Sequence, residues 1–296
     1  MIRMNSDKTS INWYPGHMKK TMDMFSEEIK QVDVVLEILD ARIPLSSRNP
    51  EISKIVGNKT RIVLLNKVDL VDKNKLDIWK KYFLKTNTAD YIIPISAEKG
   101  MNIKDIKSKI KELYNKKLEK VAKKGLRKTQ IRSIIAGIPN VGKSRLINRL
   151  SSKSKAGVGN MPGFTRGKQW INVDDNFFIL DTPGVLWPKF DSHSVAVNLA
   201  ITGSIKDDVL PIEEVCIELL KKMKEYEILG NVYSVYGIEE GDDDYHVLLK
   251  KIENRLLINT KEFDYEQVSK RILKDYRQGK LGKFFLELPR KEIDEI

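Results

Sequence analysis

The fold is decided by the stretch Gly137-Ile-Pro-Asn-Val-Gly142-Lys143-Ser144, which follows an apolar run at residues 131–136 and opens a helical pattern. Its glycines let backbone amides approach phosphate oxygens closely, and the positive end of the helix that begins near Lys143 adds to the attraction. Lys143 would neutralise the β- and γ-phosphates of a nucleotide, and the Ser144 hydroxyl would bind magnesium. The stretch therefore predicts a phosphate-binding loop. Its expected nucleotide-binding residues are Asn140, Val141, Gly142, Lys143, Ser144 and Arg145.

A second motif, Asn66-Lys67-Val68-Asp69, lies upstream of this loop and directly follows an apolar run at residues 62–65. Guanine, unlike adenine, carries a 2-amino donor beside a ring N–H, and the carboxylate of Asp69 can accept hydrogen bonds from both. Asn66 would face the base edge that carries O6 and N7, and the aliphatic stem of Lys67 would cover the base. The motif therefore predicts a site that reads guanine.

The order of these two motifs is inverted. In an ordinarily ordered GTPase the phosphate loop opens the domain, and the base-reading motif lies well downstream. No second N-K-x-D occurs after Gly137 in this sequence. Either the base is read by something else, or the GTPase domain is circularly permuted, which is tolerable because domain termini often lie close together.

The segment Ser96-Ala97 follows a third apolar run and suits a loop whose backbone amides support guanine O6. A turn that caps a helix is the alternative interpretation of this short segment. Preceded by the base-reading motif and followed by the phosphate loop, it is predicted to contact the nucleotide.

Another segment, Asp181-Thr-Pro-Gly184, ends an apolar run and lies far enough after Ser144 to leave room for a switch loop. Asp181 would hold the water shell of the magnesium ion, and the Gly184 amide would meet the γ-phosphate. In the intervening glycine-rich segment, Thr165 is the predicted second magnesium ligand and part of the catalytic machinery. The γ-phosphate orders such a loop in switching GTPases.

Alternating strand and helix patterns predict the fold class. Buried strands are expected at residues 34–39, 62–65, 91–95, 131–136 and 177–180, with helices between them, for example at 76–84 and 103–121. This order predicts an α/β domain with a mostly parallel sheet and helices on both faces. After about residue 190 amphipathic helical patterns take over. We therefore expect a permuted GTPase domain over residues 1–190 and a smaller all-helical domain over residues 191–296.

Composition limits the partners. The chain has 296 residues, with 53 Lys plus Arg against 41 Asp plus Glu and a formal net charge of +12. This charge favours a polyanion, either nucleic acid or a membrane surface. The basic stretch at residues 116–132 is either a nucleic-acid contact or a solvated helix face and loop. Without an apolar run of about eighteen residues or an apolar N-terminal stretch, the sequence predicts a soluble intracellular protein. The single cysteine, Cys216, excludes an internal disulfide and is expected to be buried.

Together these motifs make the chain resemble the ribosome biogenesis GTPase A family, whose members are circularly permuted GTPases. The segments that carry the resemblance are Trp13-Tyr14-Pro15-Gly16-His17-Met18, Asp40-Ala-Arg42-Ile-Pro44-Leu-Ser-Ser-Arg48-Asn49-Pro50, Asn66-Lys67-Val68-Asp69, Gly137-Ile-Pro-Asn-Val-Gly-Lys-Ser144 and Asp181-Thr-Pro-Gly184. They span the whole predicted GTPase domain, whereas the helical domain fits the family mainly by position and length.

The resemblance implies a GTP hydrolase that acts in late assembly of the large ribosomal subunit, slow alone and stimulated by the subunit. GTP, GDP and magnesium would be its ligands, with potassium as an activator, and its helical domain would contact ribosomal RNA. We further expect a monomer in the bacterial cytoplasm, with an organelle matrix as the alternative, and no stable membrane association.

Four residues of this sequence deserve separate predictions. In Ras-like enzymes a glutamine after the glycine of D-x-x-G orients the attacking water, but here that position is Val185. The resemblance suggests His17 for this role, with a structural histidine as the alternative. Asn140 occupies the position that coordinates potassium in potassium-activated relatives, or it is a tolerated turn residue. Arg145 stands where the family usually has threonine; because the loop uses this residue mainly through its amide, nucleotide binding should survive.

Two other classes of function compete with this interpretation. In the first, the chain is a nucleotide-gated RNA-binding scaffold in which hydrolysis is incidental and GTP merely orders the loop around Thr165. In the second, a membrane-associated GTPase uses its basic helices on anionic lipid, but the C-terminal helical patterns carry charges of both signs and no large aromatic face.

Overall fold

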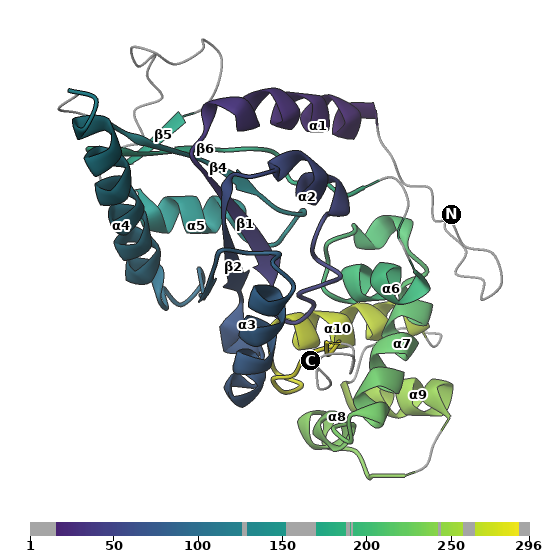
Figure 1. Ribbon diagram of the computed structural model, residues 1–296. Helices are drawn as coiled ribbons and strands as arrows, with labels where there is room; N and C mark the ends of the chain where they lie inside the picture. Colours follow the sequence, from purple (N-terminus) through teal and green to yellow (C-terminus); the bar gives the residue numbers. More distant parts are fainter. Residues whose placement is uncertain are drawn as a thin grey trace. The chain divides into compact units, whose positions relative to one another are not determined.

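The computed structural model describes residues 16–125, 129–151, 170–187, 190, 192–241, 244–256 and 264–289 (Figure 1). The chain divides into two compact units. Among the described residues, 16–187 and Glu287 to Pro289 form the first, which we call the sheet unit. Residue 190 and residues 192 to 286 form the second, which we call the helical unit.

The sheet unit is built around one six-stranded sheet with the spatial order β3-β2-β1-β4-β6-β5. The strands are β1 (Val34–Asp40), β2 (Thr60–Asn66), β3 (Tyr91–Pro94), β4 (Ile131–Ala136), β5 (Trp170–Asp174) and β6 (Phe177–Leu180). Neighbouring strands run parallel except β5, which pairs antiparallel with β6. The five expected strands are confirmed. The sixth, β5, was not expected because it is short and alternates buried with exposed residues at only part of its length.

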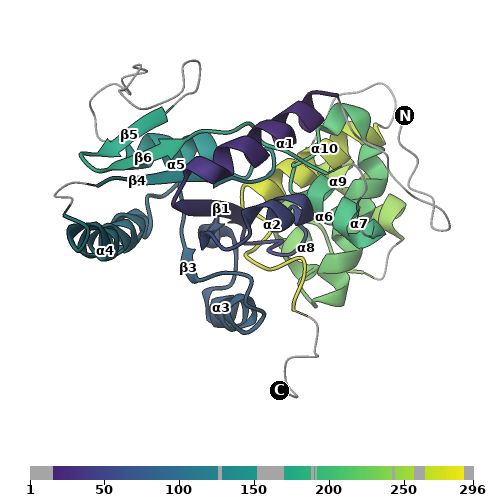
Figure 2. The same cartoon turned by 45° about the horizontal axis from the view of Figure 1, so that its top comes forward.

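Helices cover both faces of this sheet. They are α1 (Gly16–Glu28), α2 (Pro50–Val56), α3 (Leu76–Lys85), α4 (Ile103–Ala122) and α5 (Lys143–Leu150), with single 3-10 turns at Ile29–Gln31, Val68–Leu70 and Lys73–Lys75. Phe25 of α1 and Ile52 of α2 share one buried cluster with Val35 of β1, Ile134 of β4 and Phe178 of β6. Figure 2 shows α4 on the opposite side of the sheet from α1. Burial of this kind, at about 25 cal/mol per Å² of apolar surface, holds the layers together.

Two lysines of the basic stretch, both on α4, contact other groups of the protein. Lys116 Nζ lies 2.7 Å from Glu112 Oε1, and Lys117 Nζ donates to Asp33 Oδ1 at 2.7 Å and to the Gln130 carbonyl at 2.7 Å. The helix buries only residues in its first half, and its second half carries lysines on its surface. A nucleic-acid contact and a solvated helix face therefore both stay predictions for this stretch.

The helical unit contains α6 (His193–Ile201), α7 (Ile212–Glu225), α8 (Gly230–Tyr236), α9 (Tyr245–Leu256) and α10 (Tyr265–Arg277), with a 3-10 turn at Asp207–Val209. Leu219 of α7, Ile252 of α9 and Ile272 of α10 are fully buried, and α10 packs against both other helices. Cys216 is buried as expected, and burial raises the pKa of its thiol to about 12. The all-helical character expected for this region is therefore confirmed over its described residues.

An arginine ties α10 to the end of α6 inside the helical unit. The guanidinium of Arg277 donates to the carbonyls of Ala200 and Ile201 at 2.9 Å each, and it pairs with both carboxylate oxygens of Asp207 at 2.7 and 2.8 Å. The last carbonyls of a helix have no partner within the helix, so Arg277 satisfies them with a favourable charge.

The chain returns to the sheet unit after the last helix. Oε1 of Glu287 accepts hydrogen bonds from the amides of Leu45 and Ser46 at 2.6 and 2.9 Å, and the Ser46 hydroxyl donates to Oε2. Residues 287–289, which the sequence assigns to the helical domain of residues 191–296, therefore belong to the sheet unit. Sequence patterns could not show this return because about 240 residues separate the partners.

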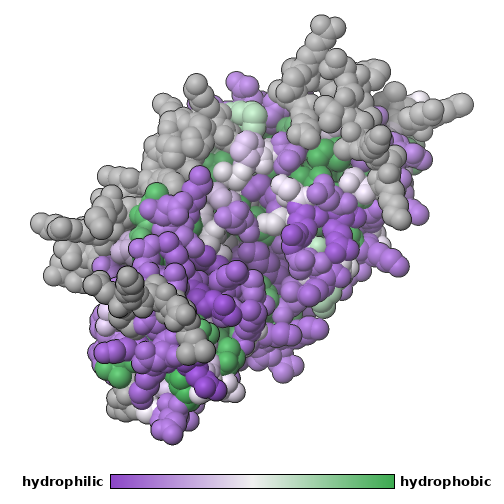
Figure 3. Space-filling model, turned by 180° about the vertical axis from the view of Figure 1, so that it is seen from behind, coloured by the Kyte–Doolittle hydropathy of each residue, from purple (hydrophilic) through white to green (hydrophobic). Residues whose placement is uncertain are grey.

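The surface of the described residues is mainly hydrophilic on the face drawn in Figure 3. Large apolar side chains that remain exposed, such as Ile78, Val235 and Val247, are scattered, which is normal for folded proteins. None of the helices in the described part of the chain is long and apolar enough to cross a membrane.

Candidate functional site

The site lies where the order of the strands in the sheet reverses, between β1 and β4. From β1 the chain continues outward to β2 and β3, whereas β4 lies on the other side of β1 and leads to β6 and β5. In such sheets ligands bind outside the carboxyl ends of the strands at this switch point. The residues that end or follow these strands are Asp40, Asn66, Ser96, Gly137 and Asp181. The topology thus brings together, at one edge, all the described motifs found in the sequence.

Asn66 joins the three segments that should surround the nucleotide. Its Nδ2 donates to the Val141 carbonyl at 2.7 Å, and its Oδ1 accepts from the Ala97 amide at 2.9 Å. The side chain is buried, with only 2% of the residue exposed. The sequence predicts that Asn66 faces the base edge that carries O6 and N7. Because the Asn66 amide has two N–H groups, one N–H remains for that edge.

Gly142 fits against Asn66 only because it has no side chain. Its φ of 105° lies in the left-handed region, and a Cβ there would come within 2.4 Å of Asn66 Nδ2. Any other residue would push the phosphate loop away from the base-reading motif.

Asp69 is prepared to accept hydrogen bonds. It lies in the 3-10 turn Val68–Leu70, and its Oδ1 is buried without a hydrogen-bond partner among the described residues. A buried carboxylate oxygen without a partner is costly, so the site has the acceptor that the ring N–H and 2-amino group of guanine require.

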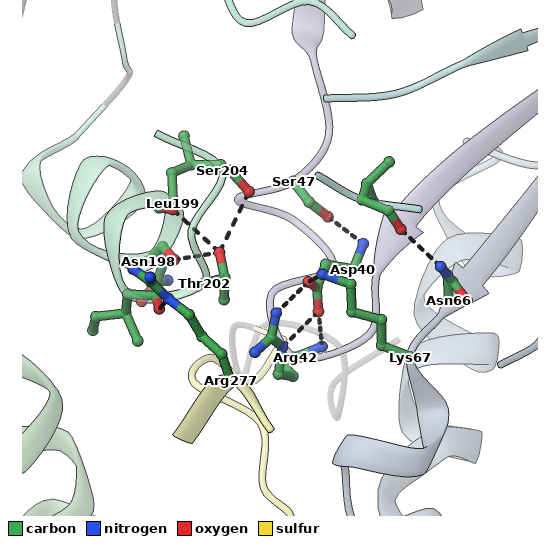
Figure 4. Close-up of polar contacts among 12 residues, drawn as sticks. Asp40, Arg42, Ser47, Asn66, Lys67, Asn198, Leu199, Thr202, Ser204 and Arg277 are labelled. Carbon is green, nitrogen blue, oxygen red and sulfur yellow. Dashed lines mark hydrogen bonds and ion pairs between the residues drawn. The ribbon is translucent and has the colours of Figure 1, made fainter. Parts of the chain in front are cut away.

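Lys67 and Asp40 form an ion pair beside the base-reading motif. Lys67 Nζ lies 2.9 Å from Asp40 Oδ2, and Arg42 grips the same carboxylate with Nε at 2.9 Å and Nη2 at 2.7 Å (Figure 4). Burial raises the pKa of Asp40, but the charges of Arg42 and Lys67 outweigh it and hold this pKa well below its ordinary value. In the sequence, Asp40 and Arg42 belong to a segment that resembles the family, but no role is predicted for either residue.

Lys143 is buried at the centre of the phosphate loop. Its Nζ donates to the carbonyls of Gly137 at 2.9 Å and Ile138 at 3.0 Å. Burial lowers its pKa to about 8, an effect that the nearby carboxylate of Asp181 partly opposes. Burial likewise raises the pKa of Asp181, against the attraction of Lys143. A desolvated ammonium of this kind is stabilised by the arrival of an anion.

The D-x-x-G segment lies directly against the phosphate loop. A Cβ on Gly184 would come within 2.8 Å of both Lys143 Nζ and the Pro139 nitrogen. The next residue, Val185, donates its amide to the Gly137 carbonyl at 3.3 Å, and Thr182 Oγ1 donates to the Ile135 carbonyl at 2.6 Å. Glycine at position 184 therefore permits the close approach that sensing a γ-phosphate requires.

Helix α5 supports the serine-alanine loop, a role the sequence did not indicate. Arg149 donates to the carbonyls of Ala97 at 3.1 Å and Glu98 at 2.7 Å. Arg145, the departure from the family pattern, forms an exposed ion pair with the Glu98 side chain. Both contacts connect the phosphate-binding helix to the loop predicted to support guanine O6.

The structure describes some of the remaining predicted site residues and not others. Thr165 lies outside the described residues, and so does the side chain of His17, although its backbone belongs to α1. Asn140 has a left-handed φ of 58° and is exposed. Ser144 is exposed at the start of α5. No group of three or more His, Cys, Asp or Glu suited to a metal occurs in the described part of the chain.

Known proteins resemble this chain over nearly its whole length. A family model described as 50S ribosome-binding GTPase matches residues 132–258. The match begins in β4 and leaves out Asn66 to Asp69, as expected if the base-reading motif has moved in front of the phosphate loop. Among solved structures, GNP-bound YlqF from T. maritima matches with a TM-score of 0.60 and 24% identity, over 92% of this chain and 99% of that chain. This likeness supports the permuted fold.

Curated relatives define the family more closely. Ribosome biogenesis GTPase A of Bacillus cereus is 41% identical over 97% of this chain and 96% of its own length. The protein of the same name from Priestia megaterium is 41% identical over 95% of this chain and 97% of its own. Mitochondrial ribosome-associated GTPase 1 of Bos taurus is 31% identical over 93% of this chain and 88% of its own. The resemblance predicted from the motifs is confirmed: the chain belongs to the ribosome biogenesis GTPase A family, with a circularly permuted GTPase domain and a helical C-terminal part.

Proposed function

We propose that this protein binds GTP and GDP with magnesium and hydrolyses GTP during late assembly of the large ribosomal subunit. In the GTP state it would bind the pre-subunit and its ribosomal RNA, and hydrolysis would release it. The observation that carries the nucleotide part is the position of Asn66, which holds the base-reading motif against both the phosphate loop and Ala97. The names of the relatives support the ribosomal part.

Magnesium would be held by Ser144 and, through water, by Asp181, with Thr165 as a further ligand. This donor set fits magnesium, which usually keeps several waters and takes few protein ligands beside substrate phosphates. When bound, the ion would neutralise charge on the β- and γ-phosphates. Asn140, on the phosphate loop, is the proposed ligand of an activating potassium ion.

Hydrolysis needs a group that orients the attacking water, and Val185 has only an aliphatic, buried side chain. We assign this role to His17. His17→Ala is expected to keep its GTP and GDP affinity but to lose the turnover stimulated by large-subunit particles, measured as phosphate release. The matched control is His193→Ala, which changes an exposed histidine of the helical unit and should leave turnover unchanged. Stimulated turnover at the wild-type rate in His17→Ala would remove this residue from the mechanism.

One loop of the sheet unit contacts both the segment after Gly184 and the chain segment that follows the helical unit. In the loop after β1, Asn49 donates to the Val185 carbonyl at 3.2 Å, and Ser46 binds Glu287, where the chain leaves the helical unit. Because Val185 directly follows Gly184, movement of the γ-phosphate sensor would reach this loop. Such contacts fit a switch in which GTP controls how the helical unit holds RNA.

Co-sedimentation with large-subunit particles tests the switch. We expect the protein to pellet with the particles in a non-hydrolysable GTP analogue and to remain in the supernatant in GDP. Asp69→Asn, which should no longer read guanine, is the matched nucleotide-blind control and should show no difference between the two nucleotides. Equal pelleting of the wild-type protein in GDP and in the analogue would contradict the switch.

The second candidate function, a nucleotide-gated scaffold, differs in turnover. An assembly enzyme should hydrolyse GTP slowly alone and much faster with particles, whereas a scaffold should show the same slow rate in both. We favour the enzyme because the relatives are named GTPases. We further propose that the protein is monomeric and cytoplasmic and makes no stable membrane association.

A further inference from the structure

We propose that Asp40 is a positioning residue for the guanine base: its ion pair holds the Lys67 side chain in the place where it covers the base. This proposal rests on the proposed binding of guanine nucleotides. It gives a role to the Asp40-Ala-Arg42 segment, for which the sequence predicts none.

The sheet brings Asp40 and Lys67 together. Asp40 ends β1 and stands in register with Asn66, the last residue of β2. The ladder continues for one step, because the Ala41 amide donates to the Asn66 carbonyl at 2.7 Å. Lys67 follows Asn66 directly, so its Nζ reaches Asp40 Oδ2 at 2.9 Å. Strand pairing, rather than a flexible loop, thus fixes the spacing of the pair.

The carboxylate that receives Lys67 is itself immobilised. Arg42 donates its backbone amide and Nε to Oδ1 at 3.1 and 2.9 Å and its Nη2 to Oδ2 at 2.7 Å. The Asp40 amide donates to Ser47 Oγ at 3.0 Å. Both Asp40 and Arg42 are 1% exposed. A buried ion pair contributes little net stability compared with apolar residues of the same size, so its value here lies in fixing an atom position.

Lys67 is the residue that needs such a partner. Its backbone has a left-handed φ of 67°, which is uncommon for residues other than glycine. Its side chain is about one-fifth exposed, and a long lysine side chain loses much conformational freedom when it is ordered. Ordering the side chain before the nucleotide arrives lowers the entropic cost of binding. Loss of the ion pair should therefore weaken GDP binding about tenfold.

Glu37 provides a matched control on the same strand. It is also 1% exposed, and its carboxylate pairs with Arg48 Nε at 3.3 Å and Arg61 Nη1 at 3.8 Å. No described contact connects it with Lys67. Glu37→Gln should therefore lower the unfolding temperature, as loss of a buried pair does, while the GDP dissociation constant stays at the wild-type value.

The test is a double-mutant cycle on GDP affinity, measured by calorimetry with wild type, Asp40→Asn, Lys67→Met and the double variant. Each single variant should bind GDP about tenfold more weakly, and the double variant no more weakly than Lys67→Met, because Asp40 acts only through Lys67. A purely structural role of Asp40 predicts additive losses instead, and additivity would overturn the proposal.

Asp40→Asn leaves Arg42 buried beside a neutral group, which could prevent folding. Asp40→Glu keeps the charge but displaces the carboxylate by one methylene. A double-mutant cycle built with Asp40→Glu distinguishes the same two outcomes, additive and non-additive losses of GDP affinity. GDP binding by the wild-type protein separates failure of the proposed function from failure of the proposed role of Asp40. Failure of the wild-type protein to bind GDP would overturn the proposed function, whereas GDP binding with an additive cycle would overturn only the role of Asp40.

Discussion

Asp69→Asn is expected to weaken GDP binding by a hundredfold or more and to create binding of xanthosine diphosphate. The carboxylate can accept from both the ring N–H and the 2-amino group of guanine. An asparagine amide can still accept from the ring N–H, but its NH₂ group then faces the 2-amino donor. Hydrogen bonds to a charged group contribute about 1.5–3 kcal/mol each. Xanthine carries an oxygen at that position, so the amide donates to it and the pairing is restored.

The folded protein should tolerate this change well. In the free protein Asp69 Oδ1 has no hydrogen-bond partner among the described residues, so removing the charge breaks no described contact of that oxygen. We expect the unfolding temperature without nucleotide to stay at or slightly above the wild-type value. The measurement is calorimetric titration with GDP and with xanthosine diphosphate.

Asp72→Asn is the matched control for Asp69→Asn. Asp72 lies three residues further along and caps the short turn Lys73–Lys75 by accepting from the Asn74 amide at 3.0 Å. Asparagine caps helices about as well as aspartate, so both nucleotide affinities should stay at wild type. Unchanged GDP affinity in Asp69→Asn would show that another residue reads the base, and the interpretation of the inverted motif order would lose its basis.

The elements that sequence patterns predict well are those with local signals. The buried strands and the helices α3 and α4 follow from periodicity, and their observed bounds differ from the expected ones by at most two residues at either end. The nucleotide-binding motifs are recognisable in the sequence because each follows or ends an apolar run. The rule that ligands bind at the carboxyl ends of parallel strands then predicted that these segments meet, and in the structure the described ones do.

Other features could not be predicted because their partners are distant in the chain. The contact of Glu287 with Ser46, the grip of Arg149 on the Ala97 loop and the bridge from Asn66 to Val141 depend on tertiary packing. Each uses a polar side chain on a backbone group, which leaves no pattern in the sequence. The Asp40–Lys67 pair had a more local signal, since Asp40 ends β1 in register with Asn66 and Lys67 directly follows Asn66.

Lys143→Met is expected to have opposite effects on stability and on binding. The ammonium would contact the nucleotide phosphates, and truncating one partner of such a charged contact costs several kcal/mol, so GDP affinity should fall about a hundredfold. The free protein should become more stable. Burial lowers the pKa of Lys143 from 10.5 to about 8, which corresponds to a cost of about 3 kcal/mol for the charged form. Loss of the hydrogen bonds to the Gly137 and Ile138 carbonyls, at about 1 kcal/mol each, returns about 2 kcal/mol of that cost, so we expect a net gain of about 1 kcal/mol.

The pH dependence identifies the buried charge as the cause of this stabilisation. Below about pH 8 the lysine is protonated in both folded and unfolded chains, so the wild-type protein bears the full cost. Between about pH 8 and 10.5 the folded protein releases the proton that the unfolded chain still holds, and the stability of the wild type rises relative to the variant. Urea unfolding at pH 7, 8.5 and 10 should therefore show the advantage of Lys143→Met shrinking towards zero near pH 8.5 and reversing by pH 10. Arg145→Met, two residues further along α5 and exposed, should show no such trend. A constant difference across this range would mean that packing, and not the buried charge of Lys143, separates the stabilities of the two proteins.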